Sequence, residues 1–303
     1  MKNLFFVSFA FDANKKTGAN IKRDVLHTYC KNICVSLLSA KASNPNMDVA
    51  LVCNVEIPRE YEELLIQNDI LIYIEEFDSF VFPNDYPWGL AYYKLCALEK
   101  MVTKYEYDHY IYTDADVFIQ NPLDDIILEL KDHILLYDTN RGFQVQNYRT
   151  TIEQFKSFGI DSYITQYGGE FFGADRKNAE DFLACCKEIY NEMINREFRT
   201  TKGDEFITSI AAHRMKTKIK NAGAYIFRFW TGDFYLVSTS YKYNEIAILH
   251  MPDEKQRGLL KLYDFFMKKH KFPDKEKVHK MCRLTRSPIK DQLSSKIRKL
   301  LKK

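Results

Sequence analysis

The sequence lacks several features that mark specialised classes of protein. Its seven cysteines form no Cys-x-x-Cys pair and their number is odd, so we expect reduced core residues in a cytosolic compartment. The formal net charge is only +3, too small to indicate a nucleic-acid partner. No apolar run is long enough to span a bilayer. The apolar start, Leu4 to Phe11, is short and runs into Asp12, which favours a first core strand over a signal peptide.

The chain is long enough for one large domain, or for one domain with an appendage. Apolar runs that read as strands alternate with segments of helical periodicity in the first half. The predicted strands are 3–11, 48–55, 70–74, 109–113 and 134–137, and the predicted helices are 24–40, 58–66 and 89–103. This alternation predicts an α/β fold, with a mostly parallel sheet flanked by helices.

Two aspartates follow the central predicted strand, in the stretch His109-Tyr110-Ile111-Tyr112-Thr113-Asp114-Ala115-Asp116. Asp disfavours strands, and a divalent cation such as Mn²⁺ or Mg²⁺ would offset the cost of placing two of them there. A strand that simply ends in a polar turn is the alternative. Ligands of such sheets bind beyond the carboxyl ends of the strands, so Ala10 and Asp12 should lie near the same cleft.

Three further motifs lie in the middle of the chain. Tyr167 to Gly173 places three glycines among aromatic residues, which indicates a close approach of the backbone to a ligand or a neighbouring strand. Gly203-Asp204-Glu205 precedes a predicted helix, where the acids could also be mere partners of the helix dipole. A late apolar strand ends in His250, and such a histidine is otherwise a common core residue.

From Gly258 the composition turns basic. The final segment, 288–303, has apolar residues on one helical face and Lys or Arg around the rest, which is typical of helices that lie on anionic membranes. A solvated final helix packed on the domain is an equal alternative. We therefore divide the chain into a domain at 1–257 and a basic helical region at 258–303.

Together, in this order, these motifs resemble GT-A glycosyltransferases. The portions "DAD…NPLDD" and "ILHMPDEK" are similar to retaining family 8, whose pattern is His-x-x-Gly-x-x-Lys, although Asp253 stands at the glycine. The portions "YGGEFFGAD" and "GDEF" resemble family 6. The resemblance covers about residues 3 to 257 and implies a Rossmann-like GT-A fold and a metal-dependent, retaining hexosyltransferase.

The resemblance also implies roles for individual residues. The metal ligands would be Asp114, Asp116 and His250. The donor, a UDP-sugar such as UDP-galactose or UDP-glucose, would contact Ala10, Asp12, Lys94, Asp114, Ala115 and Lys255. The sugar and the acceptor would be bordered by Gly168, Gly169, Glu170 and Trp230. The catalytic acids would be Asp204 and Glu205, with Glu205 beneath the reacting carbon.

The expected acceptor is a glycan or glycolipid, in bacterial surface polysaccharide or lipid-linked oligosaccharide synthesis, and the expected location is the cytoplasmic face of the cell membrane. One alternative is a haloacid-dehalogenase-like phosphatase, which needs a later Gly-Asp-x-x-x-Asp. Here Thr208 occupies the position of the second acid. Another alternative is a non-catalytic sugar-binding relative, which the intact acids Asp114, Asp116 and Glu205 disfavour.

Overall fold

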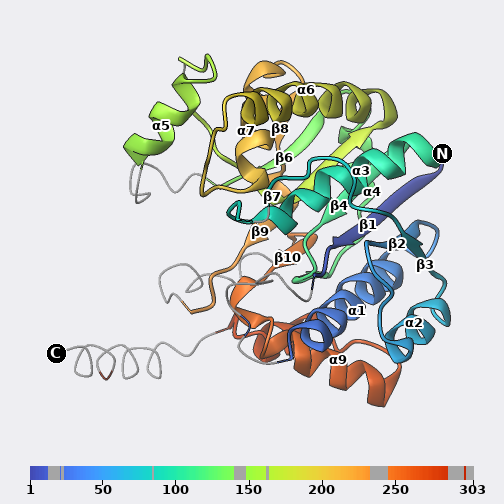
Figure 1. Ribbon diagram of the computed structural model, residues 1–303. Helices are drawn as coiled ribbons and strands as arrows, with labels where there is room; N and C mark the ends of the chain where they lie inside the picture. The colour runs from blue at the N-terminus through green and yellow to red at the C-terminus, as the bar shows by residue number, and fades with distance from the viewer. Residues whose placement is uncertain are drawn as a thin grey trace.

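The computed structural model describes residues 1–12, 21, 24–83, 85–139, 148–161, 164–232, 245–285 and 297. In this part of the chain, two sheets and the helices around them form the fold (Figure 1). The predicted final helix at 288–303 lies outside the described residues, except for Ile297. Of the helices among the described residues, none combines the length and apolar content needed to cross a bilayer.

The larger sheet has the strand order β3-β2-β1-β4-β7-β6-β8. Its strands are β1 Asn3–Phe9, β2 Asp48–Cys53, β3 Ile70–Ile74, β4 His109–Thr113, β6 Ile134–Asp138, β7 Tyr167–Asp175 and β8 Ile219–Asn221. Strands β3, β2, β1 and β4 are parallel neighbours, and β6 pairs parallel with β8. Strand β7 runs antiparallel between β4 and β6.

The smaller sheet has three strands in the described residues, in the order β5-β10-β9. They are β5 Val117–Ile119, β9 Ile226–Arg228 and β10 Ile248–His250. Because β5 follows β4 after only three residues, the chain passes from the large sheet to the small one within the Asp114-Ala115-Asp116 segment. This segment is therefore a bend between the two sheets.

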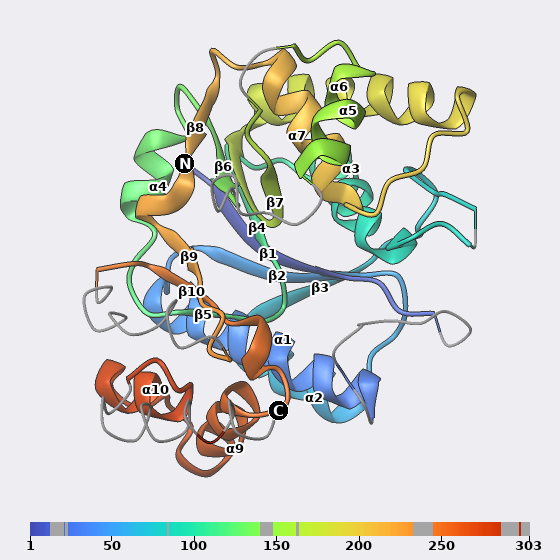
Figure 2. The same ribbon diagram turned by 90° about the vertical axis from the view of Figure 1, so that its left-hand side faces the viewer.

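Helices cover both faces of the large sheet (Figure 2). Those of the first half are α1 Val25–Ser43, α2 Arg59–Ile66, η1 Gly89–Tyr92, α3 Tyr93–Lys104 and α4 Asp124–Glu129. Those of the second half are α5 Tyr148–Lys156, α6 Arg176–Asn195, α7 Asp204–Arg214, η3 Ala222–Ala224, η5 Pro252–Glu254, α9 Gly258–Lys269 and α10 Lys275–Met281. Figure 2 shows α3, α6 and α7 on one face and α1, α2 and α9 on the other.

The alternation of side chains along β1 separates two hydrophobic cores. Phe5 and Val7 belong to the core beneath α1 and α9, whereas Leu4 and Phe6 belong to the core beneath α3 and α6. A strand buried on both faces needs an apolar residue at nearly every position, which is the run seen in the sequence. The α/β prediction is thus confirmed: a mostly parallel sheet is flanked by helices.

Candidate active site

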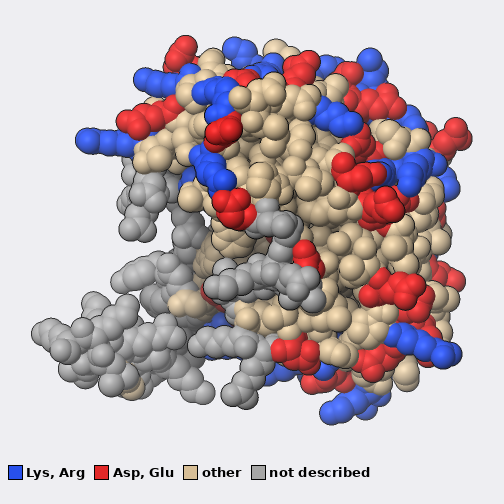
Figure 3. Space-filling model, viewed as in Figure 1, with Lys and Arg blue, Asp and Glu red and all other residues tan. Residues whose placement is uncertain are grey.

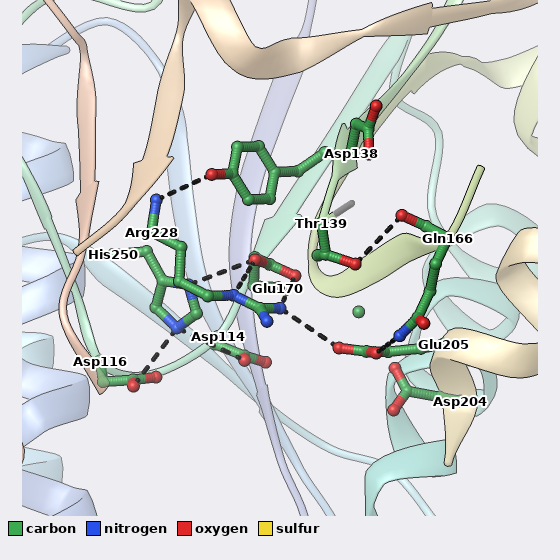
Figure 4. A network of polar contacts seen from close by, with 12 residues as sticks. Asp114, Asp116, Asp138, Thr139, Gln166, Glu170, Asp204, Glu205, Arg228 and His250 are labelled. Carbon is green, nitrogen blue, oxygen red and sulfur yellow. Dashed lines mark hydrogen bonds and ion pairs between the residues drawn. The ribbon is translucent and has the colours of Figure 1, made fainter. Parts of the chain in front are cut away.

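The predicted metal ligands meet where the two sheets join. Asp114 follows β4, Asp116 precedes β5, and His250 ends β10, which pairs with β5 through His250 and Val117. One potential ligand atom from each of Asp114, Asp116 and His250 lies within 4.8 Å of the others (Figure 4). Two carboxylates and one imidazole suit a divalent cation such as Mn²⁺.

Two positively charged groups of the protein itself balance the negative charge of Asp116 in this cluster. Nε2 of His250 lies 3.3 Å, and Nζ of Lys255 lies 2.8 Å, from Oδ2 of the buried Asp116. Burial alone would raise the pKa of Asp116, but Lys255 and His250 hold it well below its ordinary value. The site therefore already stabilises positive charge at this oxygen.

Lys94 joins the aspartate pair to the second acidic motif. Its Nζ lies 2.9 Å from Oδ1 of Asp114, 3.2 Å from Oδ2 of Asp204, and donates to the carbonyl of Gly169 at 3.0 Å. Burial would lower the pKa of Lys94, but Asp114 and Asp204 raise it well above its ordinary value. The structure thus brings Lys94, Asp114 and Asp204 together.

The two acids that begin α7 have different surroundings. Asp204 is buried, and burial raises its pKa to about 6 despite the opposing charge of Lys94. The Glu205 side chain is 22% exposed and is held from two sides. Nε2 of Gln166 donates to its Oε2 at 2.6 Å, and Nη2 of Arg228 donates to its Oε1 at 3.2 Å (Figure 4). Glu205 is therefore the more exposed carboxylate of this pair, at 22% against 5% for the side chain of Asp204.

The glycine pair of β7 allows these side chains to approach the backbone. A Cβ at Gly169 would lie 2.0 Å from Oδ2 of Asp204, and a Cβ at Gly168 would lie 1.7 Å from Oε2 of Glu170. The sequence predicted a close approach of the backbone to a ligand or a neighbouring strand. The groups that approach the two glycines are side chains of the site, and they lie on both faces of the strand.

Sequence reasoning did not single out Arg228. This residue ends β9, directly beside His250 of β10 in the register of the small sheet. Its guanidinium donates to both carboxylate oxygens of Glu170, at 2.5 and 2.6 Å. Glu170 was predicted to border the sugar, yet its side chain is 0% exposed. One sequence signal for Arg228 was its position before the strand that ends in His250. This position gains meaning only once the pairing of β9 with β10 is known.

A cavity of about 480 Å³ lies beyond the ends of strands β1, β2 and β3. Its lining residues are Phe11, Asp12, Asn54, Val55, Phe77, Val81, Phe82, Gly89 and Leu90. They follow β1, β2 and β3 or belong to η1, so the cavity lies at the same carboxyl edge as Asp114. Among the other predicted contacts, Ala10 and Trp230 are half-buried and Ala115 is buried.

Comparisons with known proteins support the fold. No protein-family model matches the chain, and a search of curated proteins finds no relative. Among solved structures, apo mouse xyloside xylosyltransferase 1 superposes with a TM-score of 0.52 at 11% identity, covering 82% of this chain and 97% of that one. The chain therefore has a GT-A-like glycosyltransferase fold. At this identity the likeness concerns the fold alone, and it does not decide between families 8 and 6.

Proposed function

We propose that the protein is a metal-dependent glycosyltransferase that moves a sugar from a UDP-sugar to a sugar acceptor with retention of configuration. The observation that carries this proposal is the convergence of Asp114, Asp116 and His250 at the carboxyl edge of a GT-A-like sheet. The acidic pair Asp204-Glu205 stands across Lys94 from this cluster. A metal, a cation and a carboxylate are what this transfer needs at one place.

The chain's own residues would divide the work at the donor. Asp114, Asp116 and His250 would hold the ion, which would supply charge neutralisation to the leaving diphosphate. Lys94 and Lys255 each balance one aspartate in the free protein, at 2.9 and 2.8 Å. With the diphosphate bound at the ion, both ammonium groups would lie beside it and would stabilise its negative charge. The cavity at Asp12 and Asn54 has a volume suited to a nucleoside.

Glu205 would act beneath the reacting carbon. Gln166 and Arg228 fix both of its oxygens, so the carboxylate is aimed before the substrate arrives. There it would either form a covalent glycosyl intermediate or stabilise an oxocarbenium ion while the acceptor enters on the face that the diphosphate leaves. Both routes retain configuration. Buried Asp204 would accept hydrogen bonds from the hydroxyls of the donor sugar.

The finer identity of the substrates follows from the resemblance and is part of the proposal. The donor would be UDP-galactose or UDP-glucose, the ion Mn²⁺ or Mg²⁺, and the acceptor a glycan or glycolipid of a bacterial surface polysaccharide or lipid-linked oligosaccharide. The enzyme would work at the cytoplasmic face of the membrane. Because the solved neighbour is by its title a xylosyltransferase, UDP-xylose belongs in any donor panel.

A donor panel followed by product analysis tests this function. Thermal shifts with Mn²⁺ and each UDP-sugar should single out one donor, and proton NMR of the product from an α-linked donor should show an α-linkage. A β-linked product would overturn the retaining assignment and the role of Glu205. Release of inorganic phosphate instead of UDP would favour the phosphatase alternative, which the GT-A-like fold does not support. Tight sugar binding without turnover would favour a non-catalytic relative.

A further inference from the structure

Arg228 and His250 occupy paired positions on neighbouring parallel strands, β9 and β10. Paired residues of adjacent strands project from the same face of a sheet. The amide of Arg228 is tied to the hydroxyl of Tyr137 in the large sheet at 3.2 Å. The small sheet thus presents a guanidinium and an imidazole side by side, toward the strand that carries Glu170 (Figure 4).

Glu170 bridges these two groups from β7 of the large sheet. Its Oε1 lies 3.5 Å from Nδ1 of His250, the ring nitrogen opposite the one that faces Asp114 and Asp116. A histidine that binds a metal through one nitrogen usually gives the other N–H to a carboxylate, which fixes its tautomer and orientation. Glu170 is placed to be that carboxylate for His250.

The same guanidinium also reaches Glu205. Nη2 of Arg228 lies 2.6 Å from Glu170 Oε2 and 3.2 Å from Glu205 Oε1. We propose that Arg228 is a positioning residue that holds Glu170 and Glu205 simultaneously, and so couples the orientation of the metal ligand His250 to that of the reacting carboxylate. This inference rests on the proposed function for the role of Glu205, whereas its metal-binding part does not need turnover.

The geometry requires arginine at this position. Its planar fork matches both oxygens of Glu170 and leaves a further N–H for Glu205, whereas a lysine offers one point charge and cannot match a carboxylate in this way. With Arg228 truncated, the carboxylate of Glu170 would remain in a fully buried position without its bidentate partner. Arg228→Lys keeps the charge in place, and so removes mainly the geometry.

A titration with Mn²⁺ in the absence of nucleotide, monitored by electron paramagnetic resonance, tests the inference. Arg228→Lys and Glu170→Gln should each weaken Mn²⁺ binding about 10- to 100-fold, the usual effect of losing an outer partner of a metal ligand. The double variant should bind Mn²⁺ about as weakly as whichever single variant binds it less tightly, because both substitutions break the same chain of contacts. With substrates, Arg228→Lys should lower kcat more than it raises KM.

Arg176→Lys is the matched control. Arg176 also donates to three oxygens, the carbonyls of Val102, Tyr105 and Tyr107, and lies away from the cluster. It should lower the melting temperature and leave Mn²⁺ affinity unchanged. If Arg228→Lys keeps wild-type Mn²⁺ affinity, or if the effects of Arg228→Lys and Glu170→Gln add fully, the inference is wrong. If the wild-type protein binds no Mn²⁺, the proposed function fails instead.

Discussion

Asp204 carries an electrostatic cost in the free protein. Its carboxylate is buried, and Lys94 offsets burial only in part, so its pKa rises to about 6. The folded protein therefore binds the proton of Asp204 more tightly than the unfolded chain does. The contribution of Asp204 to stability should therefore decline as pH rises from about 4 to about 6, and the penalty should remain complete above that range.

Asp204→Asn should remove this penalty. At pH 7.5 the variant should melt several degrees above the wild type, since two pKa units correspond to at most about 3 kcal/mol. At pH 3 the difference should be small, because Asp204 is then mostly protonated in both the folded protein and the unfolded chain. Scanning calorimetry across this pH range measures both values. Asp181→Asn, at a half-exposed acid of α6, should melt like the wild type at each pH. A pH-independent difference for Asp204→Asn would contradict the account.

Single site residues were predictable where the residues that indicate the chemistry are adjacent in the sequence. The sequence predicted Asp114 and Asp116 from two carboxylates at the end of an apolar strand, and the resemblance to family 8 added His250. The structure brings the three together. Arg228 was missed because one arginine among aromatics carries no motif. Arg228 is 58 residues away from its partner Glu170 in the sequence. Its place beside His250 follows only from the pairing of β9 with β10.

Strand β7 is the element on which the site depends. It was expected only as an irregular glycine-rich segment, yet it runs nine residues between β4 and β6. The glycines obscured it because they weaken strand patterns. They are retained here because Gly168 faces Glu170 and Arg228, while Gly169 faces Asp204 and Lys94. Regular elements such as the strand at 70–74 were predicted with correct bounds, since their apolar runs are uninterrupted.

Alanine at either glycine of this pair should disturb the site without unfolding the strand. The new Cβ of Gly168→Ala or Gly169→Ala would overlap side-chain ends, which can move only by leaving their partners. We expect each variant to lose at least tenfold in Mn²⁺-dependent UDP affinity, measured by calorimetry. The new Cβ of Gly173→Ala, farther along β7, would meet the flexible methyls of Leu130 at 3.0 and 3.6 Å and Cζ of Phe171 at 3.6 Å, and this variant should bind normally. Equal affinities for all three variants would show that close approach is unimportant.

At the scale of the whole molecule, the basic C-terminal region is attached to the main core. Leu259, Leu262 and Val278 belong to the same hydrophobic cluster as β1 and α1. Arg283 pairs at 2.5 Å with buried Glu254, the residue that precedes Lys255 in the sequence. On the face in Figure 3, the described basic and acidic side chains are interspersed, so any strong attraction to an anionic membrane would have to come from elsewhere. The boundary at 257/258 and the membrane role of 288–303 stay predictions.

Two truncations separate these possibilities. A chain that ends at Arg257 should be insoluble or unfolded, because it exposes the core beneath α9. A chain that ends at Arg286 should keep its melting temperature and its activity on a soluble acceptor, but should no longer sediment with anionic vesicles, since each lost Lys or Arg near such a surface removes about 1 kcal/mol. Equal sedimentation with and without residues 287–303 would contradict the membrane role, and a folded 1–257 chain would support the predicted boundary.

The most direct test of the central claim is calorimetric titration of UDP into the protein with Mn²⁺ and, separately, with EDTA. We predict binding with Mn²⁺ and at least a hundredfold loss with EDTA. Asp116→Asn and Asp114→Asn should each bind UDP at least a hundredfold more weakly than the wild type with Mn²⁺, whether Mn²⁺ or EDTA is present. The side chain of Asp114 is 31% exposed and is therefore easier to replace without harm to the fold. UDP binding of equal strength with Mn²⁺ and with EDTA, or wild-type affinity in both folded variants, would contradict the assignment of Asp114, Asp116 and His250 as the metal site.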